Sequence, residues 1–320
     1  MTREAAHRAF LSVAGWAEAD TAPLAGDASA RRYLRLTRHD GARAVLMDAD
    51  PATGEDVRPF RRVAEFLRGA GLSAPEVLAA DDIAGFLLLE DLGDALVARA
   101  AEERPATEPA LYAAAGETLA ALQRHAPPAD WPRATPGSLA KAVAPLFTHY
   151  APDLGGVRQT ATEAALREAL EALPREAPAP VLRDFHAENL VWLPERAGPA
   201  RLGLLDFQDA VAGHPAYDLA SLTRDARRDV SPEAAEAALA AWLAATGRAR
   251  AETAAAMALL AVQRNLRILG IFARLAEAGK PRYLALMPRV WRQLQADLAH
   301  PAAADVARAL ADLPAPRDAA

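Results

Sequence analysis

Three side chains between residues 181 and 218 are of the types that phosphoryl transfer requires. Asp184 is followed five residues later by Asn189, and Asp206 comes further along the same segment. In phosphoryl transfer, one carboxylate orients and deprotonates the attacking hydroxyl, while an amide and a second carboxylate hold Mg²⁺ on the nucleotide phosphates. The pattern therefore predicts Asp184 as the catalytic base, and Asn189 with Asp206 as the ligands of the metal and its nucleotide.

Two short apolar runs separate the metal-binding residues. Residues 190–193 follow Asn189 directly and residues 202–205 precede Asp206, with a turn-like segment rich in Pro and Gly at 194–199. Apolar runs bounded in this way are typical of strands joined by a turn. The predicted order along the chain is a catalytic loop, a strand, a turn, a second strand and the metal-binding acid.

These residues resemble a known family. The segment from Leu182 to Asn189 resembles the catalytic loop H-R-D-x-x-x-x-N of protein kinases with Leu in place of His, and Asp206-Phe207-Gln208 resembles D-F-G with Gln in place of Gly. The segment from His214 to Ala220 is more similar to the small-molecule branch, the aminoglycoside phosphotransferase family. The resemblance implies a protein-kinase-like fold of two lobes that uses ATP and Mg²⁺.

Softer motifs carry a narrower resemblance within that branch. The segments Gly26 to Tyr33, Leu205 to Ala210 and Gln263 to Leu266 resemble the bacterial anomeric sugar kinases of cell-wall recycling, which phosphorylate N-acetylmuramate and N-acetylglucosamine at C1. This implies that the acceptor is an amino sugar and that Asp184 activates its C1 hydroxyl.

The composition limits the class of protein. The chain has 320 residues, of which 52% are hydrophobic, with no cysteine and a net charge of -6. This length predicts two domains or one two-lobed unit, and the lack of cysteine excludes disulfides, cysteine-ligated metals and thiol nucleophiles. The negative charge argues against nucleic-acid binding. Since no signal peptide or membrane span is apparent, we expect a cytoplasmic protein with a small-molecule partner.

The first part of the chain, residues 1–92, is predicted to form a small, strand-rich nucleotide-binding lobe. A run ending in Glu90 and followed by Gly93 resembles the strand and hinge that hold an adenine ring through backbone groups, which places Glu90 in the nucleotide site. Periodicity and turn residues predict the other elements: a helix at 3–19, strands at 22–24, 32–37 and 42–47, and a helix at 57–70.

The lysine that grips nucleotide phosphates in kinases is missing from this lobe. Met47 occupies its expected place in the third strand, and Lys141 and Lys280 are the only lysines of the chain. Either Arg31 or Arg32 supplies the positive charge, or the nucleotide is held without one. Both arginines also fit a role as solvated residues at the edge of the sheet. Without a lysine partner, Glu65 of the following helix is expected to be solvated.

The remainder, residues 93–320, is predicted to be a larger helical lobe that carries catalysis and the substrate site, which gives an α+β fold overall. Periodic apolar segments separated by Pro-rich joints predict its helices: Glu108 to Arg124, Leu139 to Tyr150, Thr160 to Leu173, Pro232 to Ala245, Glu252 to Ala278 and Tyr283 to Leu298.

Other polar residues have less specific patterns. His186 is predicted to be a hydrogen-bonded structural residue, and Asp218 resembles the acid that braces the catalytic loop from a following helix. A further group is expected to be solvated, unless one of its arginines binds a substrate carboxylate. It comprises Asp225, Arg227, Arg228, Arg264, Asn265 and Arg267.

Two other functions compete with a sugar kinase. An antibiotic phosphotransferase would use the same chemistry, but aminoglycosides are polycations and require an acidic cleft, so the local charge of the acceptor site decides between them. A catalytically inactive nucleotide-binding scaffold is favoured by the missing lysine and opposed by the presence of Asp184, Asn189 and Asp206.

Overall fold

The structure, a computed structural model, describes residues 2–24 and 31–316 and divides the chain into two compact units. The first unit comprises Met1–Leu96 and Asn189–Asp209, and the second comprises Val97–Glu188 and Ala210–Ala320. One boundary therefore falls inside the predicted catalytic loop, immediately before Asn189. The phosphate-loop motif at residues 26–30 lies outside the described residues.

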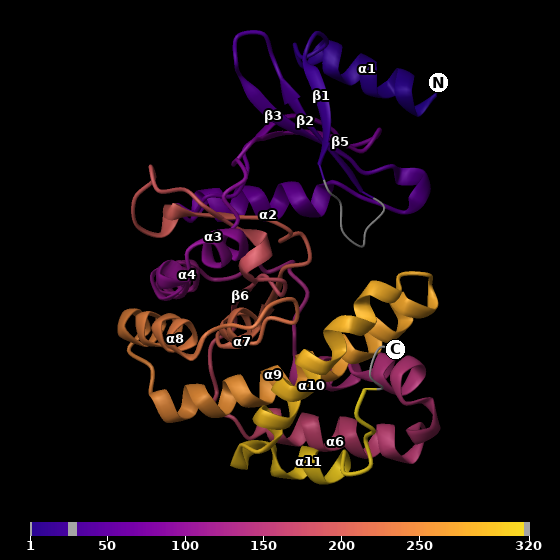
Figure 1. The fold of residues 1–320 in the computed structure, drawn as a ribbon, viewed down its shortest axis with the longest axis vertical. Helices are drawn as coiled ribbons and strands as arrows, with labels where there is room; N and C mark the ends of the chain where they lie inside the picture. The colour runs from indigo at the N-terminus through magenta and orange to yellow at the C-terminus, as the bar shows by residue number, and fades with distance from the viewer. Residues whose placement is uncertain (1, 25–30, 317–320) are drawn as a thin grey trace. The chain divides into compact units, whose positions relative to one another are not determined.

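Five antiparallel strands form the main sheet of the first unit in the order β1-β2-β3-β5-β4 (Figure 1). Asp40 and Gly41 make the tight turn between β2 and β3: Gly41 has a φ of 85°, and the Ala42 amide donates to Asp40 Oδ1. The predicted strands and this hairpin are confirmed, whereas β4 was not predicted. The bounds are β1 Asp20–Leu24, β2 Arg32–Thr37, β3 Arg43–Asp48, β4 Val77–Asp81 and β5 Phe86–Glu90.

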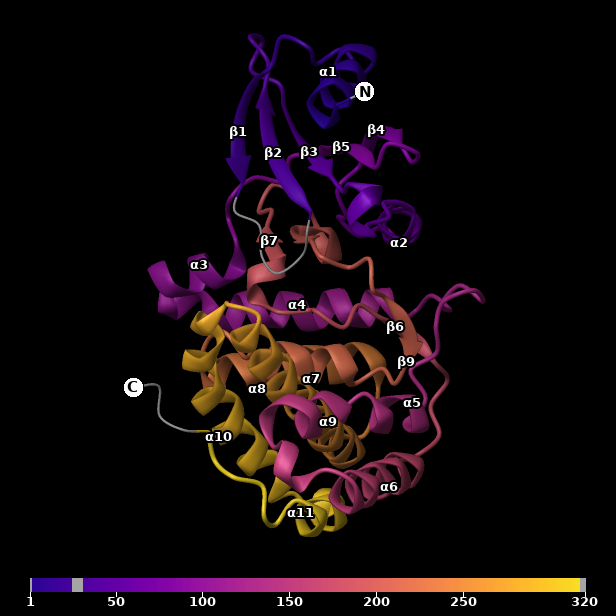
Figure 2. The ribbon, with the colours of Figure 1, turned by 90° about the vertical axis from the view of Figure 1, so that its right-hand side faces the viewer.

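Helix α1 (Arg3–Val13) covers one face of this sheet (Figure 2). Its Phe10 packs with Leu46 of β3, and because side chains alternate along a strand, Met47 is directed to the opposite face, where it is fully buried. The prediction that this helix continues to residue 19 is wrong. Gly15 follows the helix with a φ of 77°, a left-handed conformation that ends helices.

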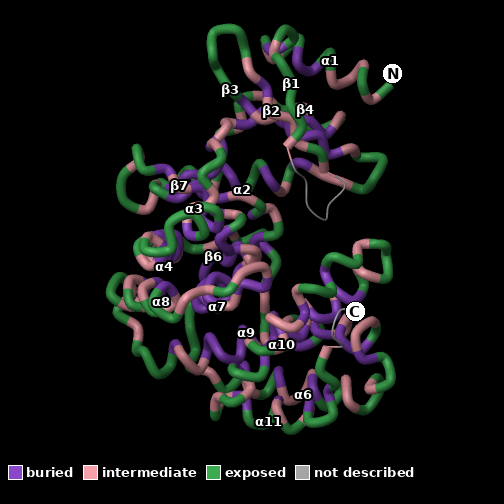
Figure 3. The backbone as a smooth tube through the Cα atoms, in the orientation of Figure 1, coloured by how far each residue is buried: buried purple, intermediate pink, exposed green. Residues whose placement is uncertain are grey.

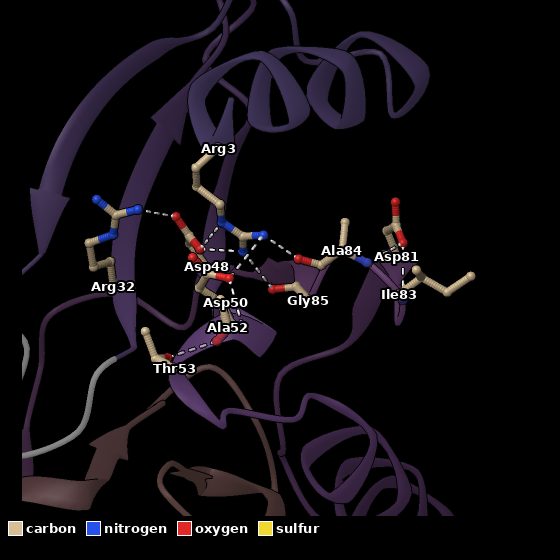
Figure 4. A network of polar contacts seen from close by, with 10 residues as sticks. All are labelled: Arg3, Arg32, Asp48, Asp50, Ala52, Thr53, Asp81, Ile83, Ala84 and Gly85. Carbon is tan, nitrogen blue, oxygen red and sulfur yellow. Dashed lines mark hydrogen bonds and ion pairs between the residues drawn. The ribbon is translucent and has the colours of Figure 1, made fainter. Parts of the chain in front are cut away.

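Ion pairs fix α1 to the end of β3 (Figure 4). Arg3 Nε donates to Asp48 Oδ1 at 2.9 Å, and its guanidinium lies 3.9 Å from the ring centroid of Phe86. The second carboxylate oxygen of Asp48 accepts from Arg32 Nη2 at 2.8 Å. Asp48 is buried, so this pair of arginines neutralises a carboxylate that would otherwise be costly to bury.

The predicted hairpin of residues 190–205 is confirmed and belongs to the first unit. Its strands β7 (Leu190–Trp192) and β8 (Leu202–Leu204) are antiparallel, and its apolar side chains pack against Leu92. Arg196 in the turn donates to Glu90 at 2.5 Å. Helix α2 (Arg58–Gly69), also predicted, contributes Phe60, whose ring lies 4.7 Å from that of Phe207.

Helix α9 is the core of the second unit. It is long and apolar enough to cross a membrane by length and composition, but 78% of its most apolar window is buried inside the protein, which is typical of a core helix. Helices α6, α7 and α10 pack against it, and Figure 3 shows the buried parts of α7 and α9. The helices of this unit are α3 Val97–Glu103, α4 Glu108–Leu122, α5 Pro136–Lys141, α6 Val157–Glu171, α7 Tyr217–Thr223, α8 Pro232–Thr246, α9 Arg250–Glu277, α10 Met287–Leu298 and α11 Ala304–Ala309.

Two predicted helices of this unit are wrong in extent. Of the segment Tyr283 to Leu298, only Met287–Leu298 is α-helix, because a 3₁₀ helix at Pro281–Leu286 precedes α10. The segment Leu139 to Tyr150 is not continuous: α5 ends at Lys141, and a separate turn of π-helix begins at Leu146. Pro145 lies between them, and proline both lacks a backbone N–H and disfavours helix in the residue before it. Helices α3 and α11 were not predicted, because each is only six or seven residues long. The helix expected to carry Asp218 after the catalytic loop is α7.

Candidate active site

Asp218 braces the backbone of the catalytic loop, as predicted. Strand β6 (Ala179–Val181) pairs with β9 (Val211–Gly213) and delivers the chain to Leu182. The Asp218 carboxylate, on α7, accepts the amide protons of Leu182 at 2.6 Å and of Arg183 at 2.9 Å. Asp218 is fully buried, so the carboxylate that accepts from these two amides is held in a fixed position away from water.

Arg183 has a backbone conformation that is uncommon for a residue with a side chain. Its φ is 72°, which costs on the order of 1–3 kcal/mol. Its amide donates to Asp218 and its carbonyl accepts from Ser221 Oγ at 3.1 Å, so both of its backbone polar groups are held. This strained residue directly precedes Asp184, which is half-buried. These hydrogen bonds therefore fix the backbone next to Asp184 and so orient the Asp184 side chain.

Replacing Asp218 by Asn is expected to reduce the free energy of unfolding by about 1–3 kcal/mol, because an amide has one acceptor oxygen for the two N–H groups. We expect kcat to fall by roughly 10- to 100-fold, as for residues that orient metal ligands. Urea denaturation and turnover measure the two effects. Asp297→Asn is the control, since Asp297 is a buried carboxylate paired with Arg224 and away from the loop. An unchanged kcat for Asp218→Asn would contradict the brace.

The same variant reports a pH dependence. Burial raises the pKa of Asp218 from 3.8 to about 7, although the amides of Leu182 and Arg183 oppose this shift. A pKa that is higher in the folded state means that protonation stabilises the fold, and this contribution is lost as the pH rises through about 7. The difference in unfolding free energy between wild type and Asp218→Asn should therefore fall with pH up to about 7 and then level off, in denaturation curves measured from about pH 4 to 8.

His186 is a structural residue, as predicted. It is 3% exposed, and its Nε2 lies 3.0 Å from Arg227 Nη1, while Arg227 Nε pairs with Glu188 at 3.0 Å. Burial holds the pKa of His186 well below its usual value, and the charges of Arg227 and Arg264 add to this effect. The imidazole is therefore neutral at physiological pH, and it is buried as part of the packing of the catalytic loop.

The β7–β8 hairpin places the two predicted metal ligands at the same end of the first unit's small sheet. Leu190 pairs with Leu204, and one step further the Leu205 amide donates to the Asn189 carbonyl at 2.9 Å. Asp206 is the next residue, so its backbone adjoins that of Asn189. It is exposed, with a φ of 56°, and its Oδ1 accepts from Gln208 Nε2 at 2.8 Å.

Oxygen donors of this kind suit a hard divalent cation. Magnesium usually binds one or two protein carboxylates and completes its shell with phosphate oxygens and water. Within residues 2–24 and 31–316 there is no group of three or more His, Asp or Glu side chains that would hold a metal alone. Asn189 and Asp206 offer two side-chain oxygens, which is the number of protein ligands that Mg²⁺ usually takes when phosphate oxygens complete its shell.

The two candidate phosphate-binding arginines occupy different surroundings. Arg31 Nε donates to Glu55 at 2.7 Å, and its side chain is only 11% exposed. Burial raises the pKa of the neighbouring Tyr33; the Arg31 guanidinium opposes that rise and the Asp206 carboxylate adds to it. Arg31 and Asp206 therefore both lie close enough to Tyr33 to affect its pKa. The side chain of Arg32 is instead 68% exposed beside Asp48.

The carboxylate of Glu90 is engaged in holding the hairpin. Besides Arg196, it accepts the amide of Glu76 at 3.2 Å. Glu65 on α2 is exposed, as predicted.

The expectation of a solvated surface group is wrong, because none of its six members is exposed and three are buried. Asp225, Arg264 and Asn265 are 1%, 6% and 0% exposed. Arg264 and Asn265 lie on α9, which is enclosed on most of its sides. Its sequence therefore lacks the separate apolar and polar faces that would show which of its polar residues are buried. Arg264 also lies within electrostatic reach of Asp218 and His186.

A cavity of about 170 Å³ opens in the second unit beside the catalytic loop. Arg183, Arg133 and Arg267 line it together with Tyr217 and Gln263. Arg183, Tyr217 and Gln263 lie in motifs that the sequence shows and Arg267 follows one of them, but Arg133 has no sequence signal, and the joining of these residues at one site could not be predicted. We refer to this site as the arginine cavity.

Comparisons with known proteins agree with this geometry. The phosphotransferase enzyme family matches residues 20–255. An N-acetylmuramate/N-acetylglucosamine kinase of Caulobacter vibrioides is 42% identical over 95% of this chain and 94% of its own, and one of Pseudomonas aeruginosa is 36% identical over 94% and 91%. A choline/ethanolamine kinase family protein from Mesorhizobium loti has the same fold, with a TM-score of 0.64 at 19% identity over 97% and 99% of the two chains. The predicted α+β, protein-kinase-like fold and the family resemblance are confirmed, and the chain belongs to the phosphotransferase enzyme family.

Proposed function

We propose that this protein is an ATP- and Mg²⁺-dependent kinase that phosphorylates the C1 hydroxyl of N-acetylmuramate and N-acetylglucosamine. The observation that carries the proposal is that relatives named for this activity match more than nine-tenths of the chain. The residues that the chemistry requires, Asp184, Asn189 and Asp206, are all present.

In the proposed reaction, the Asp184 carboxylate accepts the proton of the C1 hydroxyl. The C1 oxygen forms a bond to the γ-phosphorus of ATP. At the same time, the bond from this phosphorus to the oxygen that bridges the β- and γ-phosphates breaks, and ADP leaves with that oxygen. Mg²⁺, when held by Asn189 and Asp206, supplies the positive charge that offsets the phosphate oxygens. An anomeric hydroxyl is more acidic than an ordinary alcohol, so a carboxylate is a competent base for it.

The charge of the arginine cavity bears on the competing antibiotic phosphotransferase. Three guanidinium groups line this cavity next to the catalytic loop. A polycationic aminoglycoside would bring like charges close to them, which costs free energy, whereas a neutral or anionic sugar would not. This supports an amino-sugar acceptor.

The proposal extends to the organisation of the chain. Residues 1–92 would bind the nucleotide and residues 93–320 would carry catalysis and the sugar site. Glu90 would contribute its backbone carbonyl at the hinge, since its amide donates to the Glu76 carbonyl at 2.8 Å and its carboxylate is engaged with Arg196. We propose a cytoplasmic enzyme whose partner is a small molecule, without a nucleic-acid or membrane partner.

A coupled assay of ADP formation tests the function. N-acetylmuramate, N-acetylglucosamine and an aminoglycoside are compared as acceptors, and ³¹P NMR of the products identifies the phosphorylated hydroxyl. We expect turnover of both sugars with a C1 phosphate as the product. Turnover of the aminoglycoside alone, phosphate at another hydroxyl, or ATP binding without transfer to any acceptor would each contradict the proposal.

Arg31 is the better candidate to replace the missing lysine. Arg31→Ala is expected to raise the KM for ATP by about 10- to 100-fold, the range for loss of a hydrogen bond to a charged group. Arg31→Lys should rescue only part of this loss, because a point charge does not reproduce a planar, bidentate guanidinium.

Two further variants complete the test of Arg31. Arg32→Ala should have a smaller effect, since Arg32 pairs with Asp48 at an exposed edge. Arg61→Ala, at an exposed ion pair with Asp82 in the same unit, serves as the control with an unchanged KM. An equal KM for ATP in wild type, Arg31→Ala and the double variant of Arg31 and Arg32 would exclude both arginines from the phosphate site.

A further inference from the structure

We propose that the arginine cavity binds the carboxylate of the acceptor, the lactyl group on O3 of N-acetylmuramate, through Arg133, Arg183 and Arg267. This inference rests on the proposed function and adds to it the group that distinguishes the two sugars. N-acetylglucosamine has a hydroxyl at this position and carries no anionic group. The cavity would therefore set the preference between the two acceptors.

Protein carboxylates offset only part of the charge in the cavity: Asp184 lies within electrostatic reach of Arg267 but forms no ion pair with it among the described residues. Within the part of the chain that the structure describes, no ion pair joins Arg133, Arg183 or Arg267 to an acidic side chain. Other arginines of the same unit are paired, such as Arg224 with Asp297 and Arg228 with Glu108. An anion that enters the cavity would supply the missing counter-charge.

Arg267 shows the effect of this imbalance most clearly. It is half-buried on α9, and burial lowers the pKa of its guanidinium, with the charges of Arg183 and Arg264 adding to that effect. Guanidinium groups bind carboxylates in a planar, bidentate arrangement that combines charge with two hydrogen bonds. A carboxylate is therefore the ligand that best relieves the repulsion within this cluster.

A buried amide in the same cavity also lacks a partner. Gln263 is 0% exposed, and its Nε2 donates to the Leu139 carbonyl at 3.0 Å, but its Oε1 accepts no hydrogen bond in the structure. Burying a carbonyl oxygen without a donor costs about 1–3 kcal/mol. A hydroxyl or acetamido N–H of a sugar would satisfy this oxygen.

The size and position of the cavity suit a substituent of the reacting sugar. The cavity offers about 170 Å³. A single water molecule needs only about 10–15 Å³ of such volume, so the cavity has room for a larger group. Arg183 directly precedes Asp184, and the Asp184 carboxylate acts on the pKa of Arg267. Because C1 and C3 are separated by one ring carbon, a sugar whose C1 hydroxyl faces Asp184 carries its C3 substituent close by.

The test compares two acceptors on the same variants. Arg267→Met keeps an unbranched apolar stem and removes the charge, and we expect the ratio of kcat/KM for N-acetylmuramate to that for N-acetylglucosamine to fall by about 10- to 100-fold. Arg267→Lys should restore part of the ratio. Arg274→Met is the matched control, since Arg274 is exposed two turns further along α9 and should leave the ratio at the wild-type value.

A neutral substrate gives an independent measurement. The methyl ester of N-acetylmuramate keeps the size of the lactyl group and removes its charge, so wild type should use it less well than the free acid. In Arg267→Met, which keeps Arg133 and Arg183, this difference between acid and ester should become smaller. Arg133→Met, on the exposed side of the cavity, repeats the comparison if Arg267→Met does not fold, as judged by thermal melting.

The outcomes separate this inference from the proposed function. If Arg267→Met and Arg133→Met lower turnover of both sugars by the same factor, the cavity does not recognise the carboxylate, although the protein is still a kinase for both sugars. If wild-type protein phosphorylates neither sugar, the proposed function is wrong and this inference is wrong with it. A selective loss on N-acetylmuramate supports both.

Discussion

Asp184→Asn is expected to lower kcat by about 10²- to 10⁴-fold, the range for removal of a general base. An amide cannot accept the proton of the acceptor hydroxyl, but it has nearly the same shape as the carboxylate. The hydrogen bonds that Leu182, Arg183 and Ser221 donate within the brace do not use the Asp184 side chain, so the substitution leaves them in place. The KM for ATP and the unfolding free energy should therefore stay close to wild type.

Steady-state kinetics with N-acetylmuramate measures this loss, with urea denaturation as the test of folding. Asp153→Asn, at an exposed position of the same unit, is the matched control and should leave kcat unchanged. Turnover by Asp184→Asn within a few-fold of wild type would remove Asp184 from the mechanism.

The parts of the fold and site that could be predicted are those with a local signal. The β7–β8 hairpin consists of two apolar runs around a turn. Asp218, which braces the catalytic loop, lies in the recognisable motif at residues 214–220. The strands of the first unit were also predictable, because Asp40 and Gly41 mark a tight turn between apolar runs.

Features that depend on contacts distant in sequence could not be predicted. The arginine cavity joins Arg133, Arg183 and Arg267, which lie in three separate segments and have no common pattern. The burial of Asn265 likewise depends on the helices that surround α9. The strained backbone of Arg183 has no sequence signal either, since positive φ is usually signalled by glycine or asparagine.

The difference between Arg31 and Arg32 shows the same limit within a single dipeptide. The sequence offers the two as equivalent candidates, but neighbouring residues of an extended chain point in opposite directions. One guanidinium is mostly buried near Glu55 and Tyr33, and the other is mostly exposed beside Asp48. Only the position of the strand gives them these different surroundings.

Asp206→Ala is expected to abolish most of the effect of Mg²⁺ on nucleotide binding. The ion contributes several kcal/mol of charge stabilisation in phosphoryl transfer, so kcat/KM for ATP should fall on the order of 10²- to 10³-fold. Because the φ of Asp206 is 56°, alanine also strains the backbone, whereas asparagine tolerates this conformation. Asp206→Asn is therefore the second variant, and it should retain the fold while binding the ion more weakly.

Calorimetric titration of ATP with and without Mg²⁺ measures the effect on Asp206 variants directly. In wild type, we expect the ion to increase the affinity for ATP, and in Asp206→Ala the two titrations should nearly coincide. Glu65→Ala removes an exposed carboxylate of the same unit and should keep the wild-type response. Asn189 adjoins Asp206 at the end of the hairpin, so Asn189→Ala should reduce the Mg²⁺ response as well. If both variants at Asp206 respond to Mg²⁺ as wild type does, the ion is bound elsewhere and the hairpin does not form its site.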